Sequence, residues 1–290
     1  MSSVLPQRSF IVGISSDIAA DMSLRLLGSG SFVQGTYRTP SAQTEALATK
    51  GAELHQLDCS DKDAIASLVS DESIANQWDL LMLAPATMNP IGRFDECVWD
   101  EWEDSFALNS TRQFQFIHAL IGRRNRAGNP LVFLWSGPGS NGAAVGYSAI
   151  TAAKIAQIKM CELLAAEYPD TRFVVVGPGW VATKVHRETL AAESRAGANL
   201  ERTANRLQSP LTTTFDEIWD FFEWVNNQEV SAVSGRNFSI RSDLWGQDAL
   251  ATFLRDNPHA FKLRRANNDW KPGQQATTYE PPTYASPEVP

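Results

Sequence analysis

The 290-residue chain has few cysteines and no long hydrophobic run. Its cysteines, Cys59, Cys97 and Cys161, are odd in number and far apart, which argues against a disulfide framework and predicts reduced thiols in a cytoplasmic protein. No apolar run reaches about 18 residues, so no membrane-spanning helix is expected. The N-terminus, MSSVLPQRSF, is too polar for a signal peptide.

The chain also lacks a net positive charge and any spacing of histidines that is typical of a metal site. The formal net charge is -8 and the isoelectric point is near 5.1, which argues against nucleic acid or an anionic membrane as the partner. Four histidines show no spacing typical of metal ligands, so no metal site is expected. A small molecule is therefore the predicted substrate.

What the chain does contain is a regular alternation of short apolar runs and helical patterns. Expected strands lie near 8–14, 31–39, 52–58, 78–87, 131–135, 172–176 and 234–240. Expected helices lie near 17–28, 42–50, 61–71, 97–121, 146–168 and 216–225. This alternation predicts an α/β fold: a Rossmann-type doubly wound parallel sheet in a three-layer α/β/α arrangement.

The segment from Leu131 to Thr183 carries the residues with the clearest chemistry. Ser136 follows a predicted strand, and Tyr147 and Lys154 lie seven positions apart on the following helix. A helix turns about 100° per residue, so these two side chains share one face. A nearby ammonium lowers the pKa of a phenol, which would suit Tyr147 to proton transfer. The hydroxyl of Ser136 could hydrogen-bond the substrate oxygen that exchanges a proton with Tyr147. Together these three residues make a plausible acid/base site for the interconversion of a carbonyl and an alcohol.

These residues resemble the catalytic Ser, Tyr and Lys of the short-chain dehydrogenase/reductase superfamily, and the likeness extends from about Arg8 to about Asp243. The family usually has Y-x3-K, but the residue four after Tyr147 is Thr151. The spacing YSAITAAK is Y-x6-K, which is similar to the divergent branch that includes enoyl-acyl carrier protein reductases. The alternative is that Lys154 is a surface lysine and the usual Lys is lost.

The resemblance implies a nicotinamide dinucleotide cofactor. The family's TGxxxGxG loop corresponds to the turn after the first strand, where Gly13 is kept but Asp17 and Ala19 replace glycines. Asp17 is interpreted either as the N-cap of the following helix or as a carboxylate that repels a pyrophosphate. Arg38 at the second strand end, without an acid, favours NADP(H) over NAD(H), unless it is only a solvated residue.

Other motifs of the resemblance complete the predicted cofactor site. LAPA stands where the family has NNAG, and PGWVAT resembles the PGxxxT signature that contacts nicotinamide. The cofactor-binding residues that the resemblance implies are Gly13, Ser15, Ser16, Ile18, Arg38, Asp58, Ala84, Pro178, Gly179, Val181 and Thr183.

Two further segments are assigned by the same resemblance. Asn109 in FALNS matches the family's Asn that kinks a helix and holds a water of the proton relay. The alternative is that Asn109 is an ordinary polar residue of a helix. Residues 184–212 would form a substrate lid. The aromatic helix DEIWDFFEWV is expected in the core or at a subunit interface rather than at a ligand site.

The domain organisation is predicted as one Rossmann-type domain over 1–265 and a Pro-rich C-terminal arm over 266–290, in a homodimer or homotetramer. The favoured function is NAD(P)H-dependent reduction of a carbonyl, or an activated C=C bond, with Tyr147 as proton donor. The alternative is a degenerate member that binds a nucleotide or acts as a scaffold without redox turnover. The departures from the family pattern at Asp17 and Thr151 support that alternative.

Overall fold

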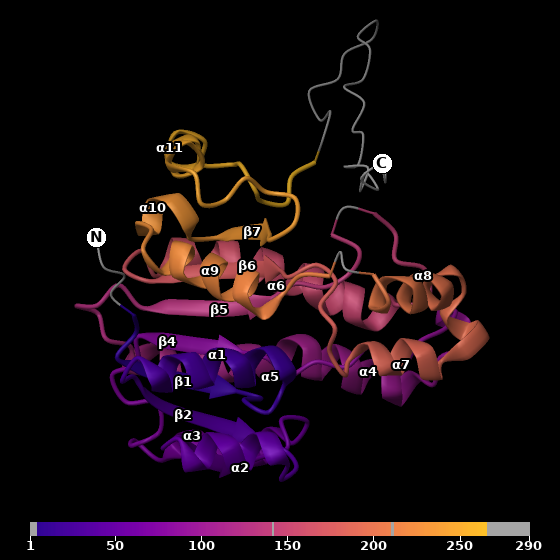
Figure 1. Cartoon of the computed structure of the whole chain (residues 1–290), viewed down its shortest axis with the longest axis horizontal. Helices are drawn as coiled ribbons and strands as arrows, with labels where there is room; N and C mark the ends of the chain where they lie inside the picture. Colours follow the sequence, from indigo (N-terminus) through magenta and orange to yellow (C-terminus); the bar gives the residue numbers. More distant parts are fainter. Residues whose placement is uncertain (1–4, 141, 210–211, 266–290) are drawn as a thin grey trace, which may run out of the picture.

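A parallel β-sheet forms the centre of the protein (Figure 1). The computed structural model describes residues 5–140, 142–209 and 212–265. Within these residues, seven strands lie in the order β3-β2-β1-β4-β5-β6-β7, and every neighbouring pair is parallel. The strands are β1 (Arg8–Val12), β2 (Phe32–Tyr37), β3 (Glu53–Gln56), β4 (Leu80–Leu83), β5 (Leu131–Trp135), β6 (Arg172–Gly177) and β7 (Arg236–Ser239).

Helices connect the strands and cover both faces of the sheet. The longer ones are α1 (Asp17–Gly28), α2 (Ala42–Thr49), α3 (Lys62–Ser70), α4 (Trp99–Phe106), α5 (Arg112–Leu120), α6 (Ser148–Glu167), α8 (Ala198–Leu207), α9 (Phe215–Asn226) and α11 (Asp248–Asp256). The shorter ones are η1 (Phe94–Glu96), η2 (Ala107–Thr111), η3 (Ile121–Arg123), α7 (His186–Ala191), η4 (Glu193–Ala196) and α10 (Val230–Val233).

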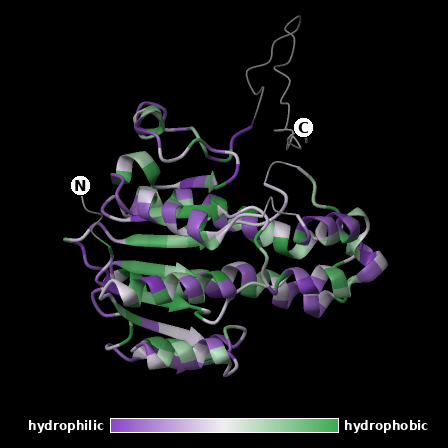
Figure 2. Cartoon of the chain, in the orientation of Figure 1, coloured by the Kyte–Doolittle hydropathy of each residue, from purple (hydrophilic) through white to green (hydrophobic). Residues whose placement is uncertain are grey.

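Two hydrophobic cores lie on opposite faces of the sheet. Alternate residues of one strand face opposite sides, so Ile11 joins one core while Phe10 and Val12 join the other. The first core includes α1 and α9, and the second includes α3, α5 and α6. Figure 2 shows the central strands as hydrophobic, as expected for a parallel sheet that is covered on both faces. The predicted three-layer α/β fold is confirmed.

The order of the strands reverses beside β1, which pairs with β2 on one side and β4 on the other. In doubly wound sheets, ligands bind outside the carboxyl ends of the strands at such a switch point. Gly13, Ala84 and Ser136 follow β1, β4 and β5 directly, so the topology brings three predicted site residues to this edge.

The predicted helix over 97–121 is interrupted. A π-helical turn, η2, separates α4 from α5, and Asn109 lies within it. The resemblance placed a kink at this residue. The aromatic helix α9 buries Ile218, Phe221, Phe222 and Val225, which places it in the core. The predicted arm over 266–290 lies outside the described residues.

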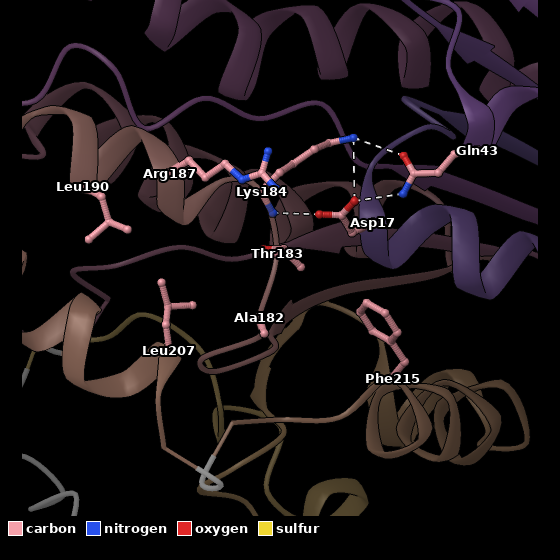
Figure 3. A pocket seen from close by; sticks show the side chains of 9 residues that line it. All are labelled: Asp17, Gln43, Ala182, Thr183, Lys184, Arg187, Leu190, Leu207 and Phe215. Atoms are coloured by element: carbon pink, nitrogen blue, oxygen red, sulfur yellow. Dashed lines mark hydrogen bonds and ion pairs between the residues drawn. The ribbon is translucent and has the colours of Figure 1, made fainter.

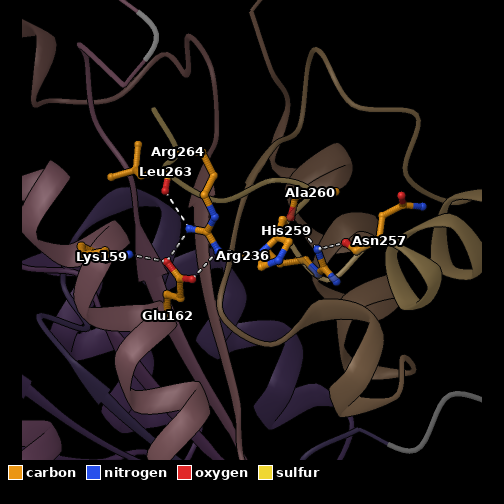
Figure 4. A network of polar contacts seen from close by, with 8 residues as sticks. All are labelled: Lys159, Glu162, Arg236, Asn257, His259, Ala260, Leu263 and Arg264. Atoms are coloured by element: carbon orange, nitrogen blue, oxygen red, sulfur yellow. Dashed lines mark hydrogen bonds and ion pairs between the residues drawn. The ribbon is translucent and has the colours of Figure 1, made fainter. Parts of the chain in front are cut away.

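Arginine contacts fix the segment that follows β7 (Figure 4). Arg236, from β7, donates hydrogen bonds to the carbonyls of Asn257 and Ala260. It also donates to the carbonyl of Leu254. Arg264 pairs with Glu162 of α6 at 2.6 Å. The hydrogen bond from Arg264 is the main reason that the pKa of Glu162 is lowered to about 2. These contacts attach the chain after β7 to the helix that carries Tyr147.

Candidate functional site

Tyr147 lies at the start of α6 and is buried against α7 and the residue that follows it. It occupies the N-cap position, is 3% exposed, and belongs to a small apolar cluster with Ile91 and Ala192. Its hydroxyl donates a hydrogen bond to Thr189 Oγ1 of α7 at 3.1 Å. Burial raises the pKa of the Tyr147 phenol, and the Thr189 hydrogen bond offsets this only in part. The pKa lowering expected from a nearby ammonium is therefore not present in this arrangement.

Lys154 is buried, so the interpretation as a surface lysine is wrong. The residue is 3% exposed, and its Nζ donates to Gln157 Oε1 at 3.0 Å. Burial lowers the pKa of the Lys154 amine to about 7. The side-chain stem passes over Gly137, where an added Cβ would lie 2.8 Å from Lys154 Cγ. Lys154 is thus next to the turn that follows Ser136.

The position of the family's usual lysine is closed by the β5–α6 connection. Thr151 stands at that position, and its Oγ1 is buried without a hydrogen-bond partner among the residues described. An added Cβ at Gly139, whose φ is +93°, would lie 2.5 Å from Thr151 Cγ2. Thr151 therefore packs directly against this turn. Lys154 lies three residues further along α6, and its amine donates to Gln157.

The turn after β1 has the backbone shape of a phosphate cradle. Gly13 has φ of +72°, and an added Cβ would lie 3.0 Å from Pro85 N, so only glycine fits. Ser16 is the N-cap of α1 but makes no side-chain cap hydrogen bond, and its buried Oγ has no partner in the described residues. These features leave the first turn of α1 open to an anion, since helix N-terminal N–H groups need acceptors.

Asp17 is not the N-cap, which corrects one interpretation of the sequence. It is the first residue of α1, and its carboxylate is held by two other segments (Figure 3). Asp17 accepts from Lys184 N at 2.7 Å and from Gln43 Nε2 at 2.9 Å. The Lys184 ammonium lies 3.7 Å from Asp17 and donates to Ser15 O at 2.7 Å. Burial opposes ionisation of Asp17, but these hydrogen bonds and the charges of Lys184 and Arg187 lower its pKa overall.

A pocket of about 600 Å³ opens beside this cluster (Figure 3). The residues that line it are Asp17, Gln43, Ala182, Thr183, Lys184, Arg187, Leu190, Leu207 and Phe215. The lining combines a cationic side with apolar side chains. Of the sequence-predicted residues, the pocket includes Thr183, whereas the catalytic candidates Ser136, Tyr147 and Lys154 do not line it.

Helix α7 also bonds to the loop after β4. Glu188 of α7 accepts from Thr87 Oγ1 at 2.9 Å and from Met88 N at 2.6 Å. Asn109 donates to Thr87 O and to Ser105 O, each at 2.9 Å, so the buried Asn109 supports the same loop. Sequence reasoning missed Glu188, since the lid has no distinctive residue pattern.

The remaining predicted cofactor residues lie at the ends of β2, β3 and β6. Arg38 and Asp58 are exposed, and Asp58 accepts from Ser60 N at 2.9 Å. That hydrogen bond is the main reason that the pKa of Asp58 is lowered. After β6, Val181 is buried and accepts a hydrogen bond from Thr183 N at 2.8 Å.

The Pro178-Gly179 turn is held closely by its neighbours. Gly179 has φ of +77°, and an added Cβ would lie 2.7 Å from Arg241 Cγ. The stacked rings of Trp180 and His186, with centroids 5.0 Å apart, join this turn to α7. Burial lowers the pKa of His186, which favours the neutral imidazole.

Within 5–140, 142–209 and 212–265, no group of three or more His, Cys, Asp or Glu residues is arranged to hold a metal ion. None of the helices in these ranges combines the length and apolar character needed to cross a bilayer.

Comparison with known proteins gives one family and many similar folds. A family model described as Enoyl-(Acyl carrier protein) reductase matches residues 13–240. No curated protein sequence matches the chain. A short-chain dehydrogenase/reductase from Saccharomyces cerevisiae superimposes with a TM-score of 0.70 at 17% identity, covering 85% of this chain and 99% of that chain.

Two other similar structures contain a nucleotide. A short-chain dehydrogenase from Shigella flexneri, complexed with NADP, has a TM-score of 0.67 at 16% identity, covering 81% of this chain and 96% of that chain. A variant of actinorhodin polyketide ketoreductase with NADPH has a TM-score of 0.69 at 18% identity, covering 80% and 95%. At these identities the likeness concerns the fold. Since the family model spans most of the sequence and the sheet has the same architecture, the chain belongs to the short-chain dehydrogenase/reductase superfamily of NAD(P)-dependent oxidoreductases.

Proposed function

We propose that the protein is an NADPH-dependent reductase that converts a carbonyl, or an activated C=C bond, of a small organic substrate. The observation that carries the proposal is the burial of Lys154 beside the turn after Ser136. A buried ammonium without a carboxylate destabilises a fold, and such groups concentrate at functional sites. A chain that had lost its chemistry would have no need to keep this amine inside.

The residues at the carboxyl edge of the sheet fit a dinucleotide. Gly13 and the uncapped start of α1 supply a backbone cradle for a phosphate, and Lys184 balances the charge of Asp17. The bound nucleotide would supply the hydride. Ser15, Ser16 and Ile18 would hold its phosphates, Asp58 the adenine end, and the segment from Pro178 to Thr183 the nicotinamide end.

The chain's own side chains would move the proton. The Tyr147 hydroxyl would transfer its proton to the substrate oxygen, and Ser136 would donate a hydrogen bond that orients this oxygen. Lys154 would hold the nicotinamide ribose and tune Tyr147, and Asn109 would hold a relay water. The Tyr147 hydroxyl must give up its hydrogen bond to Thr189 before it can donate to the substrate oxygen. The raised pKa of Tyr147 keeps it protonated before substrate binds.

Nucleotide binding is the first test, and Arg38 decides the preference. Arg38→Ala is expected to weaken NADPH binding about 10- to 100-fold and to leave NADH binding unchanged, because the guanidinium would pair only with the 2′-phosphate. Fluorescence titration of the nine tryptophans measures both nucleotides. The matched control is Arg93→Ala, an exposed arginine that pairs with Asp95 instead. Equal losses for NADPH and NADH would contradict the NADP preference.

Asp17 is expected to limit nucleotide affinity. Asp17→Asn keeps the shape of the side chain but removes a negative charge from the start of α1. The dissociation constant for NADPH should fall about 5- to 30-fold, because repulsion between the carboxylate and the phosphates is relieved. The same titration checks this, with Asp21→Asn on the same helix as the control. Weaker binding in Asp17→Asn would show that the Lys184 contact organises the site rather than obstructing it.

A second candidate function rests on the lid contacts. Thr189 holds the Tyr147 hydroxyl, and Lys184 bonds to the β1–α1 turn at Ser15 and Asp17. A protein that keeps these contacts permanently would be a scaffold or a nucleotide sensor without redox turnover. The absence of NADPH and NADH binding at millimolar concentration would favour this alternative. A homodimer or homotetramer stays a prediction in either case.

A further inference from the structure

Three buried side chains form a hydrogen-bonded chain behind the candidate site. Lys154 and Gln157 come from α6, and Gln113 comes from α5. They are 3%, 0% and 1% exposed. Lys154 Nζ donates to Gln157 Oε1 at 3.0 Å, Gln157 Nε2 donates to Gln113 Oε1 at 2.6 Å, and Gln113 Nε2 donates to Pro85 O at 2.8 Å.

The donors and acceptors of the three side chains fix the direction of this hydrogen-bonded series. A lysine ammonium has donors only, so the oxygen of Gln157 must face Lys154. The NH₂ group of Gln157 then faces Gln113 and requires the Gln113 oxygen. The NH₂ group of Gln113 is left for the carbonyl of Pro85. Reversing either amide would place donor against donor, so the arrangement has one orientation and holds the amine in one place.

The end of this hydrogen-bonded series at Pro85 lies against the predicted cofactor cradle. Ala84, next to Pro85, donates to Val12 O at 3.0 Å. Pro85 itself packs on Gly13, where an added Cβ would lie 3.0 Å from Pro85 N. The two glutamines therefore join the Lys154 amine to the loop that closes on the β1–α1 turn.

Lys154 keeps further hydrogen-bonding capacity. The ammonium has three donors, and among the described residues only Gln157 takes one. The groups that pack on it are neutral: the turn at Gly137, Gln157 on its own helix, and Gln113 through Gln157. In the part of the chain that the structure describes, burial alone perturbs its pKa, and no charged side chain contributes.

We propose that Gln113 and Gln157 are positioning residues for Lys154, which hold its amine in one place and couple it to the loop under the cofactor. The inference rests on the proposed reductase function. A carboxylate placed in this network should therefore change the titration of Lys154, whereas a carboxylate outside the network should not.

The test introduces a carboxylate at each link. Gln157→Glu places a charge beside the amine, and Gln113→Glu places it one link away. A close opposite charge favours the ammonium, so the pH inflection of kcat assigned to Lys154 should move up by about one unit or more in Gln157→Glu and by less in Gln113→Glu. Gln115→Glu on α5 is the control, because Gln115 donates to Lys62 O instead, and no shift is expected.

A second measurement does not depend on turnover. The pH dependence of urea unfolding, compared in each background with and without Lys154→Met, reports the titration of Lys154 directly. NADPH titration of the wild type tests the proposed function separately. If NADPH does not bind, the function fails while the unfolding data still decide the link between the glutamines and Lys154.

An unchanged Lys154 titration in both Gln157→Glu and Gln113→Glu would overturn the proposal. If Gln157→Glu does not fold, Gln113→Glu decides alone. The absence of a shift in the Lys154 titration in that variant would then overturn the proposal.

Discussion

Tyr147→Phe is expected to lower carbonyl reduction about 100- to 10,000-fold, because positioned general acids contribute rate factors of this order. NADPH binding should remain as in the wild type, since the phenol oxygen is the only atom removed. The fold should also tolerate the change, because the ring stays in the same apolar cluster with Ile91 and Ile150. Steady-state oxidation of NADPH with a panel of aldehydes and ketones, followed by absorbance, gives the rates.

Thr189→Val separates the chemistry of Tyr147 from its contact with the lid. Tyr147→Phe breaks the hydrogen bond to Thr189, which could by itself disturb α7. Thr189→Val breaks the same hydrogen bond while keeping the phenol and the shape of the lid side chain. Turnover should be retained or increased in this variant. Equal losses in the two variants would show that the lid contact, and not the proton, accounts for the effect.

Lys154→Met is expected to stabilise the protein at neutral pH and to abolish turnover. Burial lowers the pKa of this amine from 10.5 to about 7, so the unfolded chain binds its proton more tightly than the native state. The penalty is largest below about pH 7 and vanishes above about pH 10.5. At 1.36 kcal/mol per pKa unit, replacing Lys154 should add about 3–5 kcal/mol of unfolding free energy at pH 6. The gain should fall to less than about 1 kcal/mol at pH 10.

Urea unfolding at pH 6, 8 and 10 measures this gain, and Lys159→Met is the matched control. Lys159 lies on the same helix but is half exposed and paired with Glu162, so its replacement should cost up to about 1 kcal/mol with little pH dependence. A pH-independent change in Lys154→Met would contradict the buried, partly neutral amine. A stabilised variant that keeps full turnover would remove Lys154 from the catalytic set.

Most of the fold follows from local pattern. The runs LVFLW and FVVV are apolar throughout, which is typical of a strand whose sheet is covered on both faces. The spacing predicted Tyr147 and Lys154 on one face of a helix, but Tyr147 is the N-cap of α6 with a non-helical backbone, so the helical argument applies to Lys154 alone. The interruption of the helix at Asn109 was expected only from the family resemblance, because a π-helical turn has no clear signal in its composition.

The environments of the site residues were harder to predict from the sequence. Helix α6 is apolar on most sides, so its sequence does not show which side faces solvent. Both a functional Lys154 and a surface Lys154 were therefore compatible with the sequence. Helix α6 packs against α4, η2 and β6, and its Gln157 bonds to Gln113 of α5, so the neighbours of this helix come from other parts of the chain. Asp17 read as an N-cap, but its partner Lys184 lies 167 residues away, and no local rule connects them.

The sequence by itself determined the alternation of strands and helices, the parallel sheet and the order in which Gly13, Ser136 and Tyr147 reach its carboxyl edge. These depend on hydrophobic periodicity, which is a property of neighbouring residues. Only the tertiary structure decided that Lys154 is buried, that Asp17 is paired with Lys184 and that Thr189 holds the Tyr147 hydroxyl. Burial and pairing depend on which distant segments come together, and these contacts set the protonation of the groups that would carry out the chemistry.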